Sequence, residues 1–308
     1  MRPTVHRVDS TDADAAGGRV VVDLKKVAWN GGLLATAVIL APLTLSVDAL
    51  LVFLTSTYLT LLLGHSVGMH RCMIHRSFDC PKWLERTLVY LGVVVGMAGP
   101  FGILRIHDVR DWAQREPHCH DFFAHRRSLL LDALWQLTCR FEFEKPPRFS
   151  IEPEFFDDPW YRWLERTWML QQIPVAVLLF AIGGLPWVVW GVCLRVTMSV
   201  TGHWVVTYLT HNPGPGRWHV VDSGVQASNL TGYGLLTMGE CWHNNHHAFP
   251  ESARIGLLPG EVDPGWWVIR LLRRMGLATR VGLPREQALR EDLSEADSPY
   301  SRPRARHC

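Results

Sequence analysis

Three histidines lie close together late in the sequence, at His243, His246 and His247. On a helix, the spacings i, i+3 and i+4 place all three imidazoles on one face, about one turn apart. Neutral imidazole is the commonest metal ligand among side chains. The stretch therefore predicts half of a metal site. The alternative is a solvated polar patch, because 15 of the 308 residues are histidine and one such triple can arise by chance.

Two further pairs of histidines follow apolar runs of the sequence. His70 and His75 stand just past one run, and His203 and His211 lie at the end of a later one. A polar residue inside an apolar helix is expensive in lipid and is usually functional where it occurs. Both pairs are therefore candidates for the other half of the metal site. For His203 the alternative is a hydrogen-bonded histidine within a helix bundle.

A polar stretch between these runs carries more potential ligands. Glu116 and His120 are four residues apart, about one turn of a helix, although Pro117 removes a backbone donor between them. His118 and His125 lie close enough in the sequence to be alternatives. Because imidazole and carboxylate both serve as metal ligands, this stretch is the third place where ligands are expected.

The composition favours a membrane protein. The chain is 48% hydrophobic and only 19% charged, with 14 Trp, a residue that favours the membrane–water interface. The net charge of +2 gives no overall attraction to nucleic acid, so no nucleic-acid partner is expected. The seven cysteines form no CxxC pair, which indicates reduced thiols and not a disulfide framework.

Lys and Arg are missing from two long stretches, residues 32–69 and 169–194. Each stretch, with its flanks, accommodates two helices of the roughly 20 residues that cross a bilayer, joined by a short turn. The alternative is a buried helical hairpin in a soluble protein. A third apolar segment, 88–104, is interrupted by glycine and proline, which predicts a re-entrant or interfacial segment. The predicted spans are about 28–45, 49–69, 166–182 and 187–210.

The distribution of charge predicts the orientation. The turns at 46–48 and 183–186 carry no Lys or Arg, so the positive-inside rule places 1–27, 70–165 and 211–308 in the cytoplasm. Both termini and the histidines outside the helices then share one side. The sequence therefore predicts a multi-pass, all-α integral membrane protein, with four transmembrane helices and a cytosolic, histidine-rich helical cap.

Three parts follow from this pattern. Residues 1–27 form a polar N-terminal arm that is expected to be disordered or to lie on the surface. Residues 28–284 form the integral-membrane domain. The charged tail at 285–308 is rich in Pro and Ser and is expected to be disordered.

Two of the histidine groups resemble sequence motifs of a known family. The sequence His-Arg-Cys-Met-Ile-His-Arg-Ser-Phe at 70–78 looks like the first histidine box of the membrane acyl-CoA (stearoyl-type) fatty-acid desaturases. The sequence Gly-Glu-Cys-Trp-His-Asn-Asn-His-His-Ala-Phe-Pro at 239–250 is similar to their third box, including its flanks. The order of boxes and spans also matches over roughly residues 30–285, as in a bacterial-type member with a divergent second box.

This resemblance implies a cytosolic site with two iron ions, with O2 as co-substrate. It also implies that histidines of the boxes, and one at the end of the last span, hold the iron. Thr207 stands where the family usually has Asn. The ligands implied by the resemblance are His70, His75, His120, His211, His243, His246 and His247.

The second box departs from the family pattern, in which an acidic residue and Trp-Ala are followed by HxxHH. If Asp111-Trp112-Ala113 is the start of the box, its three histidines fall on Glu116, Cys119 and His120, so only His120 matches. A soft thiolate at Cys119 would be prone to oxidation in an iron oxygenase. The ligand set of the second iron therefore stays open, and the further candidates are Glu116, His118, His125 and His203.

The resemblance also implies where the acyl chain enters. In the family the corresponding segment contacts the substrate, and here it would place four side chains along the acyl entrance. The alternative is that they act in helix capping and hydrogen bonding. These side chains are His107, Asp108, Asp111 and Trp112.

The expected function is O2-dependent insertion of a cis double bond into a fatty acyl chain, supplied as acyl-CoA or as another acyl lipid. Only a redox metal that activates dioxygen is a strong enough oxidant for an unactivated methylene. The sequence has no haem-attachment, flavin or ferredoxin motif, so the electrons must come from an external donor such as a ferredoxin or a cytochrome b5-type carrier. The alternatives are a di-iron membrane fatty-acid or lipid hydroxylase and a non-catalytic metal-binding membrane protein.

Overall fold

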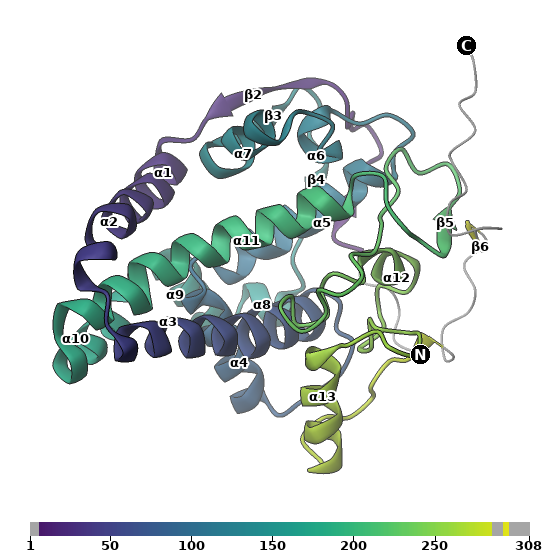
Figure 1. The fold of residues 1–308 in the computed structure, drawn as a ribbon. Helices are drawn as coiled ribbons and strands as arrows, with labels where there is room; N and C mark the ends of the chain where they lie inside the picture. Colours follow the sequence, from purple (N-terminus) through teal and green to yellow (C-terminus); the bar gives the residue numbers. More distant parts are fainter. Residues whose placement is uncertain (1–5, 285–291, 296–308) are drawn as a thin grey trace.

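The computed structural model describes residues 6–284 and 292–295, and within them the chain is mostly helical with three small two-stranded sheets. Long helices run side by side through the left and centre of Figure 1, and shorter helices and loops gather at its right. The apolar helices therefore stand at one end of the molecule, and the polar segments form a cap at the other.

Two helical stretches carry most of the apolar length. In the first, α3 (Val47–Leu59) continues directly into the π-helix η3 (Thr60–Ile74). In the second, α10 (Gln172–Val188) and α11 (Arg195–Thr210) are joined by the short π-helix η4 (Val189–Leu194). Both are long and apolar enough to cross a membrane, yet only 17% and 22% of their most apolar windows are buried. The core helix of a soluble protein would be covered instead.

Four separate spans are predicted from the sequence, whereas the described residues contain two helices long enough to be candidate spans. The predicted spans 166–182 and 187–210 fall largely in one helical stretch that breaks at Gly184, where φ is 65°, a value that glycine adopts readily. The predicted span 28–45 is divided by changes of helix type and ends at a proline. Its elements are α1 (Leu24–Lys26), η1 (Val27–Gly31), α2 (Gly32–Leu40) and the 3-10 turn η2 (Pro42–Thr44).

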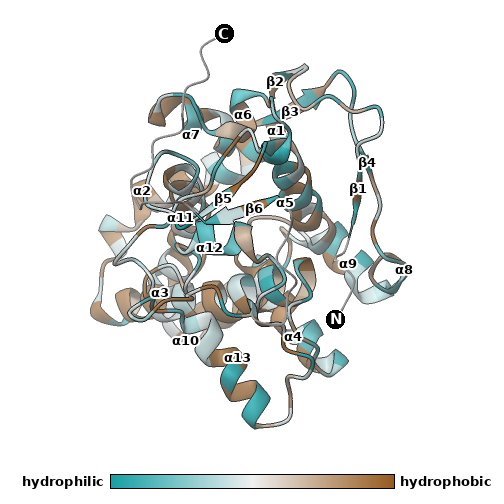
Figure 2. Ribbon diagram, turned by 90° about the vertical axis from the view of Figure 1, so that its right-hand side faces the viewer, coloured by the Kyte–Doolittle hydropathy of each residue, from teal (hydrophilic) through white to brown (hydrophobic). Residues whose placement is uncertain are grey.

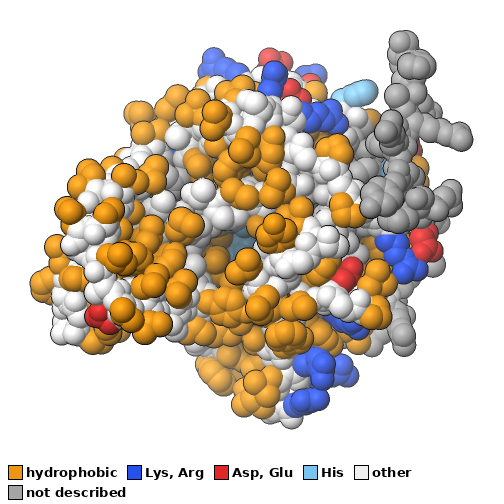
Figure 3. Space-filling view, viewed as in Figure 1, with side chains coloured by type: hydrophobic (Ala, Val, Ile, Leu, Met, Phe, Trp, Pro, Cys, Tyr) orange, Lys and Arg blue, Asp and Glu red, His pale blue; other side chains and the backbone are white. Residues whose placement is uncertain are grey.

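The exposed surface of the long helices is strongly apolar. In Figure 3 hydrophobic side chains cover the left part of the molecule, over α2, α3 and α10, while Lys and Arg lie at the top and right. A large apolar patch of this kind marks a surface that water does not normally face. Exposed residues on these helices include Leu34, Val38, Leu51, Val177 and Phe180.

The apolar segment 88–104 forms neither a single helix nor a lipid-facing one. It is divided between α4 (Lys82–Val94) and α5 (Pro100–Arg115), with a break at Gly96, where φ is 89°. Val89, Val93 and Leu104 are fully buried in the central hydrophobic core. The glycines and proline of this segment therefore separate two packed helices, and its re-entrant or interfacial position in a membrane stays a prediction.

Glycine contacts hold α4 directly against η3. A Cβ on Gly68 would lie 2.6 Å from the carbonyl oxygen of Leu88, and one on Gly64 would lie 2.3 Å from the backbone of α4. Any larger side chain at these positions would push the two helices apart. The close approach fixes the end of η3 that carries His70.

The N-terminal arm, expected to be disordered or to lie on the surface, is ordered from residue 6, and most of its side chains are exposed or half-buried. Strand β1 (Val8–Asp9) pairs with β4 (Arg148–Phe149), and β2 (Gly18–Val22) pairs with β3 (Cys139–Phe143), both antiparallel. Arg7 is buried and donates hydrogen bonds to Asp108 and Glu152 and to backbone carbonyls at the end of η3. The arm has little local structure of its own, and pairing with strands more than 100 residues away orders it.

The rest of the cap consists of short elements. Figure 2 shows that α12 is hydrophilic, whereas hydrophobic and hydrophilic residues alternate along α13. Most of the predicted disordered tail, 285–308, lies outside the described residues. The remaining elements are α6 (Asp121–Ala124), α7 (Leu129–Thr138), α8 (Pro153–Phe156), α9 (Pro159–Thr167), β5 (Trp218–Val220), α12 (His243–Ala248), α13 (Pro264–Arg274) and β6 (Leu293–Glu295), which pairs with β5.

Candidate metal centre

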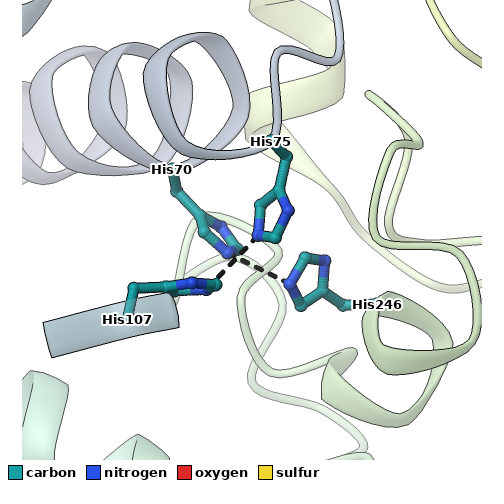
Figure 4. A group of neighbouring side chains, drawn as sticks. All are labelled: His70, His75, His107 and His246. Carbon is teal, nitrogen blue, oxygen red and sulfur yellow. Dashed lines mark hydrogen bonds between the residues drawn. The ribbon is translucent and has the colours of Figure 1, made fainter. Parts of the chain in front are cut away.

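Four imidazoles converge on one point inside the cap, and we call this group cluster A: His70, His75, His107 and His246. One nitrogen of each lies within 4.8 Å of the corresponding nitrogens of the others. Nε2 of His70 is 3.2 Å from Nε2 of His246, and Nε2 of His75 is 3.3 Å from Nε2 of His107. Figure 4 shows the four rings pointing toward one another from three separate segments of the chain. Nitrogens that face each other in this way form a site for a cation.

The π-helix explains how His70 and His75 reach the same point. The backbone N–H of His75 donates to the carbonyl of His70, the i to i+5 bond of a π-helix. In an α-helix, positions five apart point in quite different directions, because five residues turn by about 500° at 3.6 residues per turn. The wider π-turn instead brings the two rings to within 4.8 Å, centroid to centroid.

Carboxylates orient two rings of cluster A from the outside. Nδ1 of His70 lies 2.7 Å from a carboxylate oxygen of Glu240, and Nδ1 of His107 lies 3.0 Å from Asp108. A protonated Nδ1 that donates to a carboxylate leaves Nε2 with its lone pair directed into the cluster. Arg7 in turn donates to Asp108 at 2.9 Å, so the N-terminal arm supports this part of the site.

Glu240 is itself held by buried polar groups. The hydroxyl of Ser66 donates to it at 2.5 Å, and the guanidinium of Arg71 lies 3.5 Å away. Arg71 also donates to Asp263 at 2.8 Å. Burial opposes the ionisation of Glu240, but the hydrogen bond to His70 and the guanidinium of Arg71 keep its pKa well below its usual value. Glu240 therefore stays ionised beside His70.

A second group of three imidazoles lies next to the first, and we call it cluster B: His211, His243 and His247. Nε2 of His243 is 3.1 Å from Nε2 of His247. Nδ1 of His211 donates to the carbonyl of Thr207 at 2.8 Å, while its Nε2 is buried without a hydrogen-bond partner. A buried nitrogen acceptor with no donor is costly unless a cation binds it, so this atom fits a metal ligand.

The helix α12 joins the two clusters, because it carries His246 of cluster A and both His243 and His247 of cluster B. The ring centroids of His243 and His246 are 5.7 Å apart, and those of His246 and His247 are 5.9 Å apart. The spacing i, i+3, i+4 thus directs one ring to cluster A and two rings to cluster B. Two metal ions would bind as close neighbours.

Burial favours the neutral form of several of these imidazoles. It lowers the pKa of His75, His243 and His246 well below the usual value and that of His247 to about 4, and the neighbouring imidazoles of the clusters lower several of these further. Only the neutral ring has a lone pair available for a metal. The two clusters therefore match the chemistry of an ion such as iron, which imidazole binds well.

The structure does not bring His120 to either cluster. Its Nδ1 accepts a hydrogen bond from the backbone N–H of Phe122, and its ring packs against Phe141 at 4.6 Å. It therefore caps α6, which departs from the predicted role as a ligand. Glu116, at the end of α5, and His118 also lie outside both clusters, and the side chain of His118 is exposed.

His125 and His203 lie beside the clusters without joining them. The ring of His125 stacks on His211 at 5.5 Å, its Nδ1 contacts the buried Asp132 at 3.0 Å, and its Nε2 is buried without a hydrogen-bond partner. His203 instead packs against His65, 4.8 Å away, on the membrane side of the site. Of these two, His125 is the one that stacks on a ring of cluster B.

The four residues expected at an acyl entrance have different positions. His107 belongs to cluster A, and Asp108 connects it to Arg7. Trp112 packs against Phe143, 5.8 Å away, in a separate hydrophobic core. Asp111 lies one turn after His107, with an oxygen 3.8 Å from Nε2 of His107. The sequence does carry a signal for this arrangement, since His107 and Asp111 are i, i+4 on one helix.

Comparison with known proteins places the chain in a family of enzymes that act on fatty acyl chains. Residues 48–257 match the family model for fatty acid desaturase, which covers both clusters. The chain belongs to the fatty acid desaturase family, whose members are oxidoreductases. This agrees with the resemblance seen in the two histidine boxes.

The similar curated proteins act on different acyl carriers. The chain is 36% identical over 227 residues to the sn-1 stearoyl-lipid 9-desaturase of Anabaena variabilis, covering 72% of this chain and 79% of that one. It is 34% identical to the sn-2 palmitoyl-lipid 9-desaturase of Nostoc sp. (strain 36), covering 71% and 76%. It is 33% identical to the acyl-CoA 5-desaturase AL21 of Anemone leveillei, covering 80% and 75%. The likeness therefore extends through most of each protein.

Proposed function

We propose that this protein introduces a cis double bond into a fatty acyl chain, using O2 and two iron ions held by clusters A and B. The observation that carries the proposal is the pair of adjacent, buried imidazole clusters. A single metal would need one such group, whereas the seven nitrogens here divide into two groups that share α12. Membership of the desaturase family supports the same activity.

In this proposal cluster A holds one iron through His70, His75, His107 and His246, and cluster B holds the other through His211, His243 and His247. His125 is a further candidate at cluster B, because its unpartnered Nε2 is buried beside His211. His120 is left out, because its Nδ1 already caps α6. Bound iron supplies the oxidising power that removes two hydrogens from neighbouring methylenes with O2 and two electrons.

The protein's own groups prepare this site. Glu240 and Asp108 orient the rings of His70 and His107 so that their Nε2 atoms face inward. Burial excludes water and keeps the imidazoles of His243 and His246 unprotonated, so that protons do not compete with the metal for these ligands at neutral pH. The rigid contact of η3 with α4 limits the freedom of the helix that carries His70.

We further propose a multi-pass membrane protein with both termini and the site on the cytoplasmic side. The apolar surface over α2, α3 and α10 supports this orientation, with the basic side chains at the other end. An acyl chain, carried by CoA or a membrane lipid, would then reach the site from the bilayer. An external carrier such as a ferredoxin or a cytochrome b5-type protein would supply the electrons.

Expression in a host of defined lipid content, followed by mass spectrometry of all its acyl chains, tests the proposal. We expect a new monounsaturated species with a cis double bond, and we expect it to disappear with His246→Ala. His118→Ala serves as the matched control, because this exposed histidine lies outside both clusters. A hydroxylated chain without an alkene, or no new product in any lipid class, would contradict the proposed reaction. An alkene that persists in His246→Ala would contradict the ligand assignment.

A further inference from the structure

Cluster B has one imidazole fewer than cluster A, and Asp111 lies on α5 beside His107 of cluster A. The side chain of Asp111 is 13% exposed and comes from the same face of α5 as His107. One of its oxygens, Oδ2, is 3.8 Å from Nε2 of His107 in cluster A. The carboxylate therefore borders the metal centre, although the sequence suggested a place at the acyl entrance.

The other oxygen of Asp111 has no hydrogen bond. Oδ1 is buried and accepts none among the described residues, and the nearest cation is Arg110, at 3.7 Å. A buried carboxylate normally accepts several hydrogen bonds, because it gives up its water shell on burial. Asp111 thus resembles His211, whose Nε2 is also buried and without a partner. Both atoms are potential donors to a cation.

The two clusters are close neighbours, because the ring centroids of His246 in cluster A and His247 in cluster B are 5.9 Å apart. Cluster A already offers four imidazole nitrogens, whereas cluster B offers three. The unpartnered oxygen of Asp111 is therefore the candidate for the fourth donor of the second centre.

We propose that Asp111 supplies a carboxylate oxygen as the fourth ligand to the metal of cluster B. The two centres then differ in kind: cluster A binds its ion with four imidazoles, and cluster B with three imidazoles and one carboxylate. A carboxylate oxygen is a harder donor than an imidazole nitrogen, so it favours iron over softer metals. Because it is an anion, it also lowers the net charge of the second centre. This inference rests on the proposed di-iron function.

The test measures metal binding on the purified full-length chain in detergent. The metal-free protein is titrated anaerobically with Fe²⁺, and bound iron is counted. We expect two ions in the wild type, and in D111N one retained ion with the second weakened by more than about 100-fold, beyond the effect of losing an outer hydrogen-bond partner. E116Q is the control, because it neutralises a carboxylate at the C-terminal end of α5 that belongs to neither cluster. It should bind both ions as the wild type does. Two tightly bound ions in D111N, or the loss of both, would overturn the inference.

A second variant keeps the test informative if the asparagine variant fails to fold. D111H offers an imidazole in place of the carboxylate, and Co²⁺ serves as the probe because its visible absorption reports its ligands. We expect two bound ions with a changed absorption band for one of them. An absorption spectrum identical to that of the wild type would overturn the inference.

The acyl products of the same preparations separate this inference from the proposed function. If the wild type forms the alkene and D111N still binds two ions tightly, the inference fails and the proposed function stands. If the wild type forms no alkene but its second ion depends on Asp111, the proposed function fails and the ligand assignment stands.

Discussion

Clusters A and B use the same kind of side chain but are built differently. The imidazoles of cluster A come from η3, α5 and α12, and carboxylates orient two of them from outside. In cluster B a backbone carbonyl orients His211, and two of the three rings come from the single short helix α12. Cluster A is therefore complete in nitrogen ligands and firmly supported, whereas cluster B depends on groups next to it.

This difference teaches that one sequence motif does not correspond to one metal. The stretch 243–247 divides its three rings between both clusters, and the other ligands decide which ion each ring meets. His107 completes cluster A, while the candidates beside cluster B are the carboxylate of Asp111 and the ring of His125. Substitutions at the two clusters should therefore remove different ions.

The largest effect is expected from removing one ligand of either cluster. His70→Ala and His243→Ala should each reduce the alkene product by more than about 1000-fold, because each leaves a single complete centre. His70→Ala should retain the ion of cluster B, and His243→Ala should retain the ion of cluster A. Iron counting and acyl-chain mass spectrometry on the same samples check both statements. If either variant loses both ions while its fold is intact, the two clusters do not bind independently.

A smaller effect is expected from Glu240→Gln, which removes the charge that holds His70 in cluster A. Loss of such an outer partner typically lowers metal affinity by about 10–100-fold. The decrease should affect only the ion of cluster A, as measured by anaerobic Fe²⁺ titration. Glu142→Gln is a suitable control, because Glu142 forms ion pairs only with Arg19 and Arg140 in the β2–β3 sheet. Equal affinity in Glu240→Gln and the wild type would remove Glu240 from the support of the site.

The smallest effect is expected from His120→Ala. This histidine caps α6 through Phe122, so its loss should cost about 1 kcal/mol in the free energy of unfolding, the typical value for a cap. Iron content and product should stay at the wild-type level. The measurement pairs the melting temperature with the iron count, and a missing ion would return His120 to the ligand set that the family resemblance implied.

Much of the site could be predicted from local patterns in the sequence. The spacing of His243–His247 depends only on the helix that carries it, so it predicts a shared face. His70 and His75 meet only because η3 is a π-helix, which the sequence did not indicate. The ligands of the second box could not be predicted in this way. If the box begins at Asp111, all of its expected ligands lie after that residue. His107 lies before that point, one turn along α5, and only the packing of α5 against η3 brings it to cluster A.

Non-local pairing explains what else the sequence did not predict. Nothing in the run Val20-Val21-Val22 shows that it pairs with Arg140 and its neighbours, about 120 residues later. Nor does the single Arg7 indicate that it reaches Asp108 behind His107. Both contacts join segments whose positions are set by the whole fold. The N-terminal arm, expected to be disordered or to lie on the surface, is for this reason part of the structure that supports cluster A.

The number of iron ions bound to the purified wild-type chain tests the central claim most directly. The protein is reconstituted anaerobically with Fe²⁺ as the only added metal, and the bound iron is counted per chain by mass spectrometry. Two imidazole clusters that each hold an iron predict two iron ions per chain. A single bound iron, or none, would contradict the assignment of a di-iron centre.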